Sequence, residues 1–123
     1  MTKSRTAVLV VEDEAIVRMG IVSSLEDAGF EVYEASNYDE AIAMLVAKFS
    51  IRAMFTDIDM LPGINGLDLA IAVRHRWPPV KIIITSGHRQ IRNEDLPVVG
   101  RFFGKPYDAD LVAASLHEMM LAA

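Results

Sequence analysis

The sequence contains no cysteine, and its apolar runs are short. The lack of cysteine excludes disulfide bridges, thiolate metal sites and cysteine nucleophiles, and it fits a reducing compartment. The apolar run Ala7–Val11 meets Glu12 after only five residues, which is too short for a signal peptide or a membrane span. Basic residues are the minority, with 12 Lys and Arg against 17 Asp and Glu, so no basic stripe is available for nucleic acid. We therefore expect a cytoplasmic protein that binds neither nucleic acid nor a membrane directly.

Glycine-rich phosphate loops and nucleophile elbows are also missing. The seven glycines form neither a G-x-G-x-x-G nor a G-x-x-x-x-G-K-[ST] pattern, which disfavours nucleotide binding. No G-x-S-x-G sequence occurs, so acyl hydrolysis lacks its usual nucleophile. The composition is otherwise that of a globular domain, with 52% hydrophobic and 24% charged residues in 123 positions. We expect residues 1–123 to form a single, stand-alone domain.

Apolar runs of strand length alternate along the chain with helical patterns, which is typical of a parallel sheet covered by helices on both faces. The expected strands are Ala7–Val11, Glu31–Ala35, Ala53–Thr56, Lys81–Thr85 and Gly100–Phe103. The first and fourth are nearly continuous Val, Ile and Leu, so we expect them in the middle of the sheet. The second alternates and is expected nearer an edge. The predicted fold class is α/β.

The helical patterns predict four clear helices and one weak segment. The first helix is expected at Ala15–Ala28 with Gly29 at its end, the second after the capping residue Asn37, the third from Asn65-Gly66 to His75, and the last from about Asp108. Their apolar stripes contain Ile16, Met19, Val22 and Leu25 in the first helix and Leu111, Val112, Leu116 and Met119 in the last. Residues 87–99 have little apolar periodicity, so a helix there should be short, frayed or absent.

Polar residues of complementary kinds follow the predicted strands. Ligands of open parallel sheets bind beyond the carboxyl ends of the strands, near the point where the strand order reverses. Those ends carry Glu12 and Asp13, Asp57 and Asp59, Thr85 and Ser86, and Lys105. Asp13 and Asp57 cannot lie close together as bare anions without a raised pKa or a cation, and carboxylate oxygens suit a hard divalent ion such as Mg²⁺. We expect a metal-assisted phosphoryl site with Asp57 as nucleophile and with Lys105 and Thr85 contacting phosphoryl oxygens.

Several fragments resemble the receiver (CheY-like) domain of two-component response regulators. They are Val10-Val-Glu-Asp-Glu14, Phe55-Thr-Asp57 with Met60, Ile83-Ile-Thr-Ser86 and Gly104-Lys-Pro106, in the family's order and across nearly the whole chain. The resemblance implies a flavodoxin-like (βα)5 fold with a doubly wound, five-stranded parallel sheet. It also implies a phosphorylation-activated switch rather than an enzyme, with only self-phosphorylation and self-dephosphorylation chemistry.

By this resemblance, Asp57 accepts a phosphoryl group from a histidine kinase or a histidine phosphotransfer protein. Asp13 and Asp57 bind Mg²⁺ together with the backbone carbonyl of Asp59, and Glu12 acts through metal-bound water. The site residues for the metal are thus Glu12, Asp13, Asp57 and Asp59.

The resemblance further implies a switch made of Thr85, Lys105 and Phe102, the last at the position of the family's rotating aromatic. The change is then read by a downstream protein that the sequence does not name. A homodimer through the face from the fourth strand to the last helix is a further expectation.

Two departures from the family pattern concern the surroundings of the site. Pro62 and Gly66 stand one residue later than in the family, which implies a loop after Asp57 that is longer by one residue. The stretch from Thr85 to Lys105 is somewhat short and poor in helical pattern, so the surface that responds to phosphorylation is expected to differ.

Two alternatives remain open at the level of sequence. Asp57-Ile-Asp59 resembles the paired aspartates of haloacid-dehalogenase-like phosphatases, although that pair normally lies on the first strand of a longer chain. A phosphorylation-independent docking module is the other alternative.

The lifetime of the phosphorylated form follows from two positions that tune it in the family, Asp59 and Gly87. Because glycine has no side chain to orient water, we predict slow to moderate self-hydrolysis. The decay of acid-labile phosphate after removal of the donor measures it, and loss within seconds would contradict the prediction.

Overall fold

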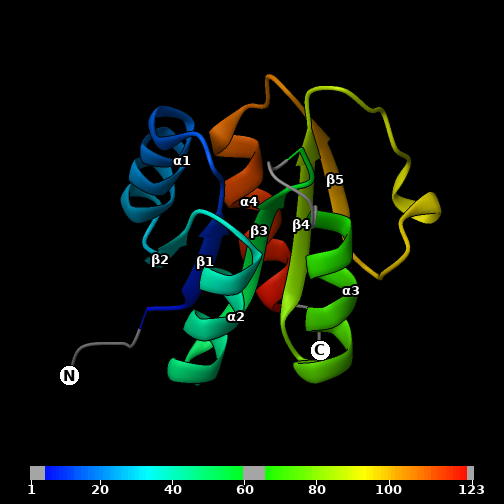
Figure 1. Cartoon of the computed structure of the whole chain (residues 1–123). Helices are drawn as coiled ribbons and strands as arrows, with labels where there is room; N and C mark the ends of the chain where they lie inside the picture. Colours follow the sequence, from blue (N-terminus) through cyan, green and yellow to red (C-terminus); the bar gives the residue numbers. More distant parts are fainter. Residues whose placement is uncertain (1–4, 60–65, 122–123) are drawn as a thin grey trace.

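The computed structural model describes residues 5–59 and 66–121. Its elements, in chain order, are β1 (Ala7–Val11), α1 (Ala15–Asp27), β2 (Glu31–Ala35), α2 (Tyr38–Ala47), β3 (Ile51–Asp57), α3 (Gly66–Arg76), β4 (Lys81–Ser86), the 3₁₀ turn η1 (Asn93–Asp95), β5 (Arg101–Gly104) and α4 (Ala109–Leu121) (Figure 1). The strands form one parallel sheet in the order β2-β1-β3-β4-β5. The predicted α/β, doubly wound, five-stranded parallel fold is confirmed.

The position of each strand follows its hydrophobic pattern. β1 is buried along its whole length and β4 is buried except at Lys81, and both lie inside the sheet as predicted. β2 is an edge strand and is less buried: Glu31 and Glu34 are exposed, whereas Val32 and Tyr33 are half-buried. Three strands differ from the prediction in their bounds: β3 is longer at both ends, β4 includes Ser86, and β5 begins and ends one residue later.

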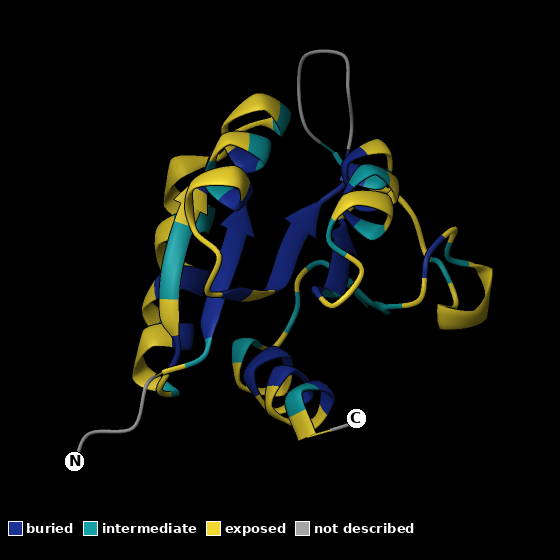
Figure 2. Ribbon diagram, turned by 90° about the horizontal axis from the view of Figure 1, so that it is seen from below, coloured by how far each residue is buried: buried dark blue, intermediate teal, exposed yellow. Residues whose placement is uncertain are grey.

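Two apolar layers hold the helices against the sheet. Successive residues of each strand point to opposite faces of the sheet. On one face, Leu9, Met54 and Ile84 pack toward α2 and α3. On the other face, Val8 and Phe55 pack toward α1 and α4. Figure 2 shows the buried strands between helices whose outer faces are exposed. Because both faces of the central strands are covered, the open part of the sheet is the row of strand ends.

The helix ends agree with the capping residues that the sequence predicts. Gly29, with φ of +99°, follows the end of α1 in the left-handed conformation that glycine adopts most easily. Asn37 caps α2, since its side chain accepts a hydrogen bond of 2.9 Å from the Glu40 N–H. The predicted start of α3 at Asn65 lies partly outside the described residues, and the described helix begins at Gly66. The lengthened loop after Asp57 also lies outside them.

The predicted inward faces of two helices are partly wrong. Ile16 and Met19 in α1 are 85% and 66% exposed, and Leu111 in α4 is 60% exposed. The buried face of α1 is centred on Ile21, Val22 and Leu25. At about 100° per residue, Ile16 lies on the side opposite this face, and Met19 and Leu111 lie at the margins of theirs.

The weak segment contains no α-helix, as predicted. Between β4 and β5 the described backbone makes only the turn η1 and otherwise forms an irregular loop with bends, on the outer side of β5 (Figure 1). Val98 is buried, and Ile91 and Leu96 pack against the same apolar layer as Ile84. A few apolar side chains therefore replace a helix on this part of the sheet.

The helices of the described residues are short. The longest, α1 and α4, have 13 residues each. No helix in the described part of the chain is long and apolar enough to cross a membrane.

Substitution of Gly66 tests the close approach of α3 to the end of β3. A Cβ at Gly66 would overlap the Asp57 carbonyl oxygen and lie 2.9 Å from the Cα of Ile58, so Gly66→Ala should destabilise the fold by about 1–3 kcal/mol. Gly20→Ala is the matched control, because nothing lies near its Cβ position inside α1, and it should stabilise by about 0.5–1 kcal/mol. Urea unfolding measures both, and equal effects of the two substitutions would contradict the steric argument.

Candidate phosphoryl and metal site

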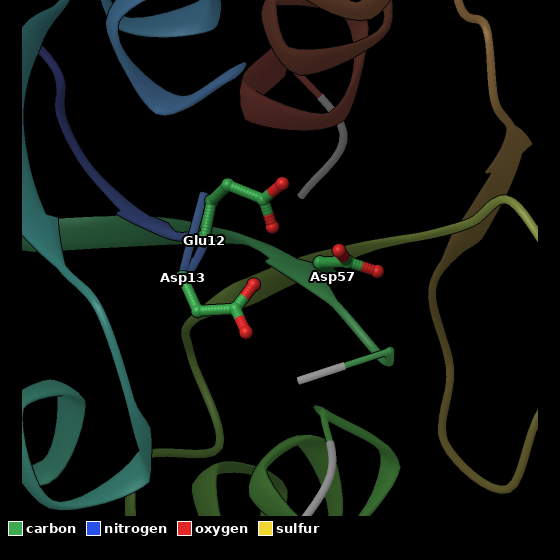
Figure 3. A group of neighbouring side chains, drawn as sticks. All are labelled: Glu12, Asp13 and Asp57. Carbon is green, nitrogen blue, oxygen red and sulfur yellow. The ribbon is translucent and has the colours of Figure 1, made fainter. Parts of the chain in front are cut away.

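Three carboxylates meet where the strand order reverses. Glu12 and Asp13 follow β1, and Asp57 is the last residue of the neighbouring strand β3. One oxygen from each lies within 4.8 Å of the others, and Figure 3 shows the three side chains converging on one space. Glu12 and Asp57 are buried, while Asp13 is half-buried. The predicted grouping of Glu12, Asp13 and Asp57 is thus present in the geometry.

Lys105 brings a positive charge to this cluster from the loop after β5. Its Nζ donates to Asp57 Oδ2 at 2.7 Å and to Glu12 Oε1 at 3.3 Å. Its main-chain N–H donates to the Ser86 carbonyl at 2.9 Å, and a cis peptide bond joins it to Pro106. The ammonium is therefore held by two buried acids that are far from it in the sequence.

The crowding decides which acid keeps a proton. Burial, with a hydrogen bond and repulsion from Asp57, raises the pKa of Glu12 to about 8. Burial also opposes the charge of Asp57, but hydrogen bonds from Glu12, Lys105 and the Asp59 N–H outweigh it and hold the pKa of Asp57 below its usual value. Lys105 is likewise partly desolvated, yet its contacts with Asp57 raise the pKa of the ammonium. The surroundings therefore favour the protonated form of Glu12 and the anionic form of Asp57.

Thr85 lies directly opposite Asp57 in the pairing of β3 and β4. Its Oγ1 is buried and makes no hydrogen bond within the described residues. A buried hydroxyl without a partner is uncommon, because its desolvation costs free energy. Next to a carboxylate, this hydroxyl is suited to an oxygen that arrives only when a ligand or a covalent group is added.

Asp59 is predicted to contribute its backbone carbonyl, and its side chain lies apart from the three clustered carboxylates. Its carboxylate accepts hydrogen bonds from the Ser86 hydroxyl at 2.7 Å and from the Gly87 N–H at 3.0 Å. Its own N–H donates to Asp57 Oδ1 at 2.9 Å. An acid/base role of Asp59, which the phosphatase alternative requires, has no support in this geometry.

Phe102 lies on β5, which β4 separates from the strands β1 and β3 that carry the cluster. It is half-buried and packs with the apolar layer that faces α3, whereas Phe103 faces α1 and α4. Its register partner is Ile84, next to Thr85. The position is compatible with the predicted coupling to Thr85, and the rotation itself stays a prediction.

Two residues near the site were given no role in the sequence analysis. The Ser86 hydroxyl donates a hydrogen bond to the Asp59 carboxylate. Arg18 donates from Nη1 to the Glu12 carbonyl at 2.7 Å, and its Nε pairs with the Glu34 carboxylate at 3.1 Å. Ser86 was visible in the sequence as the neighbour of Thr85. Arg18 carries no such signal, because a basic residue on an amphipathic helix is ordinarily solvated.

The cluster has the donor set of a hard divalent cation. Its side chains offer carboxylate oxygens only. Lys105 lies on one side of Asp57, and the carboxylates of Asp13 and Asp57 lie near each other. Such oxygen ligands suit Mg²⁺, which retains several waters and binds phosphate. The residues present therefore fit the predicted metal.

Comparison with known proteins identifies the family. The model of the response regulator receiver domain matches residues 8–113. The chain belongs to the response regulator receiver domain family. Members of this family are phosphoacceptor switches that interact with histidine kinases or phosphotransfer proteins and bind Mg²⁺ at an acidic pocket.

Individual relatives support this assignment. The chain is 31% identical over 117 residues to the sensor kinase CckA of Brucella abortus, covering 92% of this chain and 12% of that protein. The curated relatives are longer, and the chain spans between 12% and 35% of the length of the first three.

Solved receiver structures share the fold. A receiver protein of Sinorhizobium medicae superimposes with a TM-score of 0.87 at 28% identity, covering 96% of both chains. The response regulator TrrA of Thermotoga maritima, solved in complex with Mg²⁺ and BeF, gives 0.81 at 25% identity, covering 93% of this chain and 98% of that one.

The pKa of Glu12 predicts how divalent-cation affinity depends on pH. Since Glu12 holds a proton below about pH 8 and a nearby cation favours the carboxylate, binding should release this proton. Mg²⁺ affinity should then rise by up to about tenfold per pH unit below that value and level off above it. Calorimetric titration over a pH series measures it.

Two variants identify the group responsible. Glu12→Gln removes the titrating carboxyl and should flatten the profile. Glu14→Gln removes an exposed carboxylate two residues away and should leave it unchanged. An equally steep profile in Glu12→Gln would show that another group releases the proton.

Proposed function

We propose that this protein is a phosphorylation-activated signalling switch in which Asp57 accepts a phosphoryl group from a histidine kinase or a histidine phosphotransfer protein. The observation that carries the proposal is the buried Asp57 carboxylate, ionised beside Lys105 and facing the unpartnered hydroxyl of Thr85. This arrangement provides a nucleophile together with donors for the oxygens of the group that it would receive.

The transfer forms a bond between an Asp57 carboxylate oxygen and phosphorus. The P–N bond of the phosphohistidine breaks, and its electron pair stays on the imidazole nitrogen, which then takes a proton from solvent. Asp13, Asp57 and the backbone carbonyl of Asp59 would hold Mg²⁺, with Glu12 acting through metal-bound water, and the bound ion would supply positive charge for the phosphoryl oxygens. The anion that this reaction needs is favoured at Asp57, because hydrogen bonds from Glu12, Lys105 and the Asp59 N–H hold the pKa of Asp57 low.

The switch follows from the change in charge at Asp57. The new phosphoryl group carries about −1.5 to −2 charges and three acceptor oxygens. Lys105 can follow the charge from the carboxylate to a phosphoryl oxygen, and the Thr85 hydroxyl gains the acceptor that it lacks. Movement of Thr85 would change the space beside Ile84 and Phe102, where the predicted aromatic switch lies.

Exposed apolar side chains near the site support a protein as the phosphoryl donor. Ile16 and Met19 lie on α1, which begins two residues after Asp13, and Leu111 lies in the first turn of α4, after Lys105. Since α1 and α4 pack side by side, these residues lie on neighbouring helices that both begin close in the sequence to site residues. A contiguous exposed apolar surface is of the kind that other proteins cover. A homodimer through the face from β4 to α4 stays a prediction.

Incorporation of phosphate tests the proposal. With Mg²⁺ and phosphoramidate, the protein should gain one acid-labile, hydroxylamine-sensitive phosphoryl group, detected by intact mass. Asp57→Asn should abolish the gain, because an amide is a poor nucleophile. Asp27→Asn, an exposed aspartate at the end of α1, should incorporate as the wild type does.

The competing functions have distinct readouts. Retention of the phosphoryl mass in Asp57→Asn would refute the acceptor role. Many turnovers of a phosphomonoester would favour the phosphatase alternative, and equal partner binding by wild type and Asp57→Asn with and without donor would favour the docking module.

A further inference from the structure

The segment that replaces a helix between β4 and β5 is tied to the phosphorylation loop by a small hydrogen-bond network. We call residues 87–99 the edge strap. We propose that Asp59 and Ser86 form the link through which modification of Asp57 loosens the edge strap at its start. This inference rests on the proposed function and goes beyond it, because it assigns Asp59 and Ser86 as positioning residues and names the element that they control.

The network joins Asp57 to the strap in three steps. The Asp59 N–H donates to Asp57 Oδ1, and the Asp59 carboxylate accepts from the Ser86 hydroxyl and the Gly87 N–H. The Ser86 Oγ in turn accepts from the N–H groups of His88 and Arg89, each at 3.1 Å. Ser86 is fully buried, and its single hydroxyl proton is already donated to Asp59. Three successive N–H groups of the strap therefore depend on one carboxylate and one hydroxyl.

The strap covers the free edge of the sheet. The outward-facing N–H of Phe102 donates to the Asn93 side chain at 2.9 Å instead of to a neighbouring strand. The Gln90 side chain lies against Gly104, and Arg74 holds the Val99 carbonyl at 2.9 Å. An exposed strand edge is a template for pairing with another chain, and here side chains of the strap occupy it.

Beyond Ile91, which packs against the apolar layer, and Asn93, which accepts from the Phe102 N–H, few contacts of the described residues hold the first half of the strap. Gly87, His88, Arg89 and Gln90 are exposed, and the ion pairs of Arg92 with Glu94 and Asp95 are exposed pairs within the strap. Exposed ion pairs contribute little, and segments with few buried contacts open at low cost. The bonds to Asp59 and Ser86 are therefore the main attachment of the strap to the site.

Modification of Asp57 acts directly on this attachment. It converts the carboxylate that Asp59 N–H contacts into an acyl phosphate, whose carbonyl is a weaker acceptor, and adds negative charge near the Asp59 carboxylate. At the same time, any movement of Thr85 toward the phosphoryl group displaces its neighbour Ser86. Both effects act on the hydrogen-bond network that holds the start of the strap.

Residue-resolved amide exchange by NMR tests the link. In wild type, Mg²⁺ and beryllofluoride should accelerate exchange at Gly87, His88 and Arg89 by about tenfold or more, as expected for loss of hydrogen bonds to a charged group. In the unmodified protein, Asp59→Asn should accelerate Gly87 most, and Ser86→Ala should accelerate His88 and Arg89 most. Both variants should lose most of the further response to beryllofluoride.

Two controls separate the link from general loosening. Asp95→Asn removes another exposed carboxylate of the strap that touches neither Asp59 nor Ser86, and it should leave exchange at residues 87–89 and its response unchanged. Asn93→Ala should accelerate exchange at Phe102 alone. Thermal unfolding of each variant verifies that the fold is retained.

The outcomes distinguish this inference from the function on which it rests. Bound beryllofluoride, seen by fluorine NMR, with unchanged exchange at residues 87–89 would overturn the link and leave the acceptor role intact. An undiminished response in Asp59→Asn would do the same. Failure to bind beryllofluoride and to gain phosphoryl mass would refute the proposed function and the coupling together, even where Asp59→Asn releases the strap.

Discussion

Glu12, Asp13 and Asp57 place their carboxylates close together at a point where the apolar sheet removes much of the screening water. Such a group repels itself, and it persists only because Lys105 donates to two of its members and Glu12 keeps a proton. The rest of the site is arranged around this balance. The remaining negative charge favours binding of a divalent cation, and such a cation in turn binds phosphate.

The sheet makes this costly cluster tolerable. β1, β3 and β4 bury Val, Ile, Leu, Met and Phe on both faces, and the core fixes the strand ends to which the acids and Thr85 belong. The edge strap has the opposite character, with a short 3₁₀ turn and mostly exposed residues. A rigid site beside a weakly held segment is the arrangement in which a change of charge at one point can shift a local equilibrium.

Much of this architecture could be read from local patterns. The strand order along the chain, the edge position of β2, the cap at Asn37 and the missing helix follow from periodicity and from capping residues, which act over a few positions. The faces of α1 and α4 were assigned less well, because the spacing of Ile16, Met19 and Leu111 is compatible with more than one orientation of the helix on the sheet. Only contact with the strands selects among these orientations.

The sequence by itself determined the fold class, the family and the chemical types gathered at the strand ends, because each depends on residue kind and order. The tertiary structure decided where the proton lies, which acids cluster, that the Asp59 carboxylate turns to Ser86, and that Asn93 covers the β5 edge. These properties depend on distances between groups that are remote in the chain. Electrostatic and hydrogen-bond energies change steeply over a few ångströms, so no pattern along the sequence specifies them.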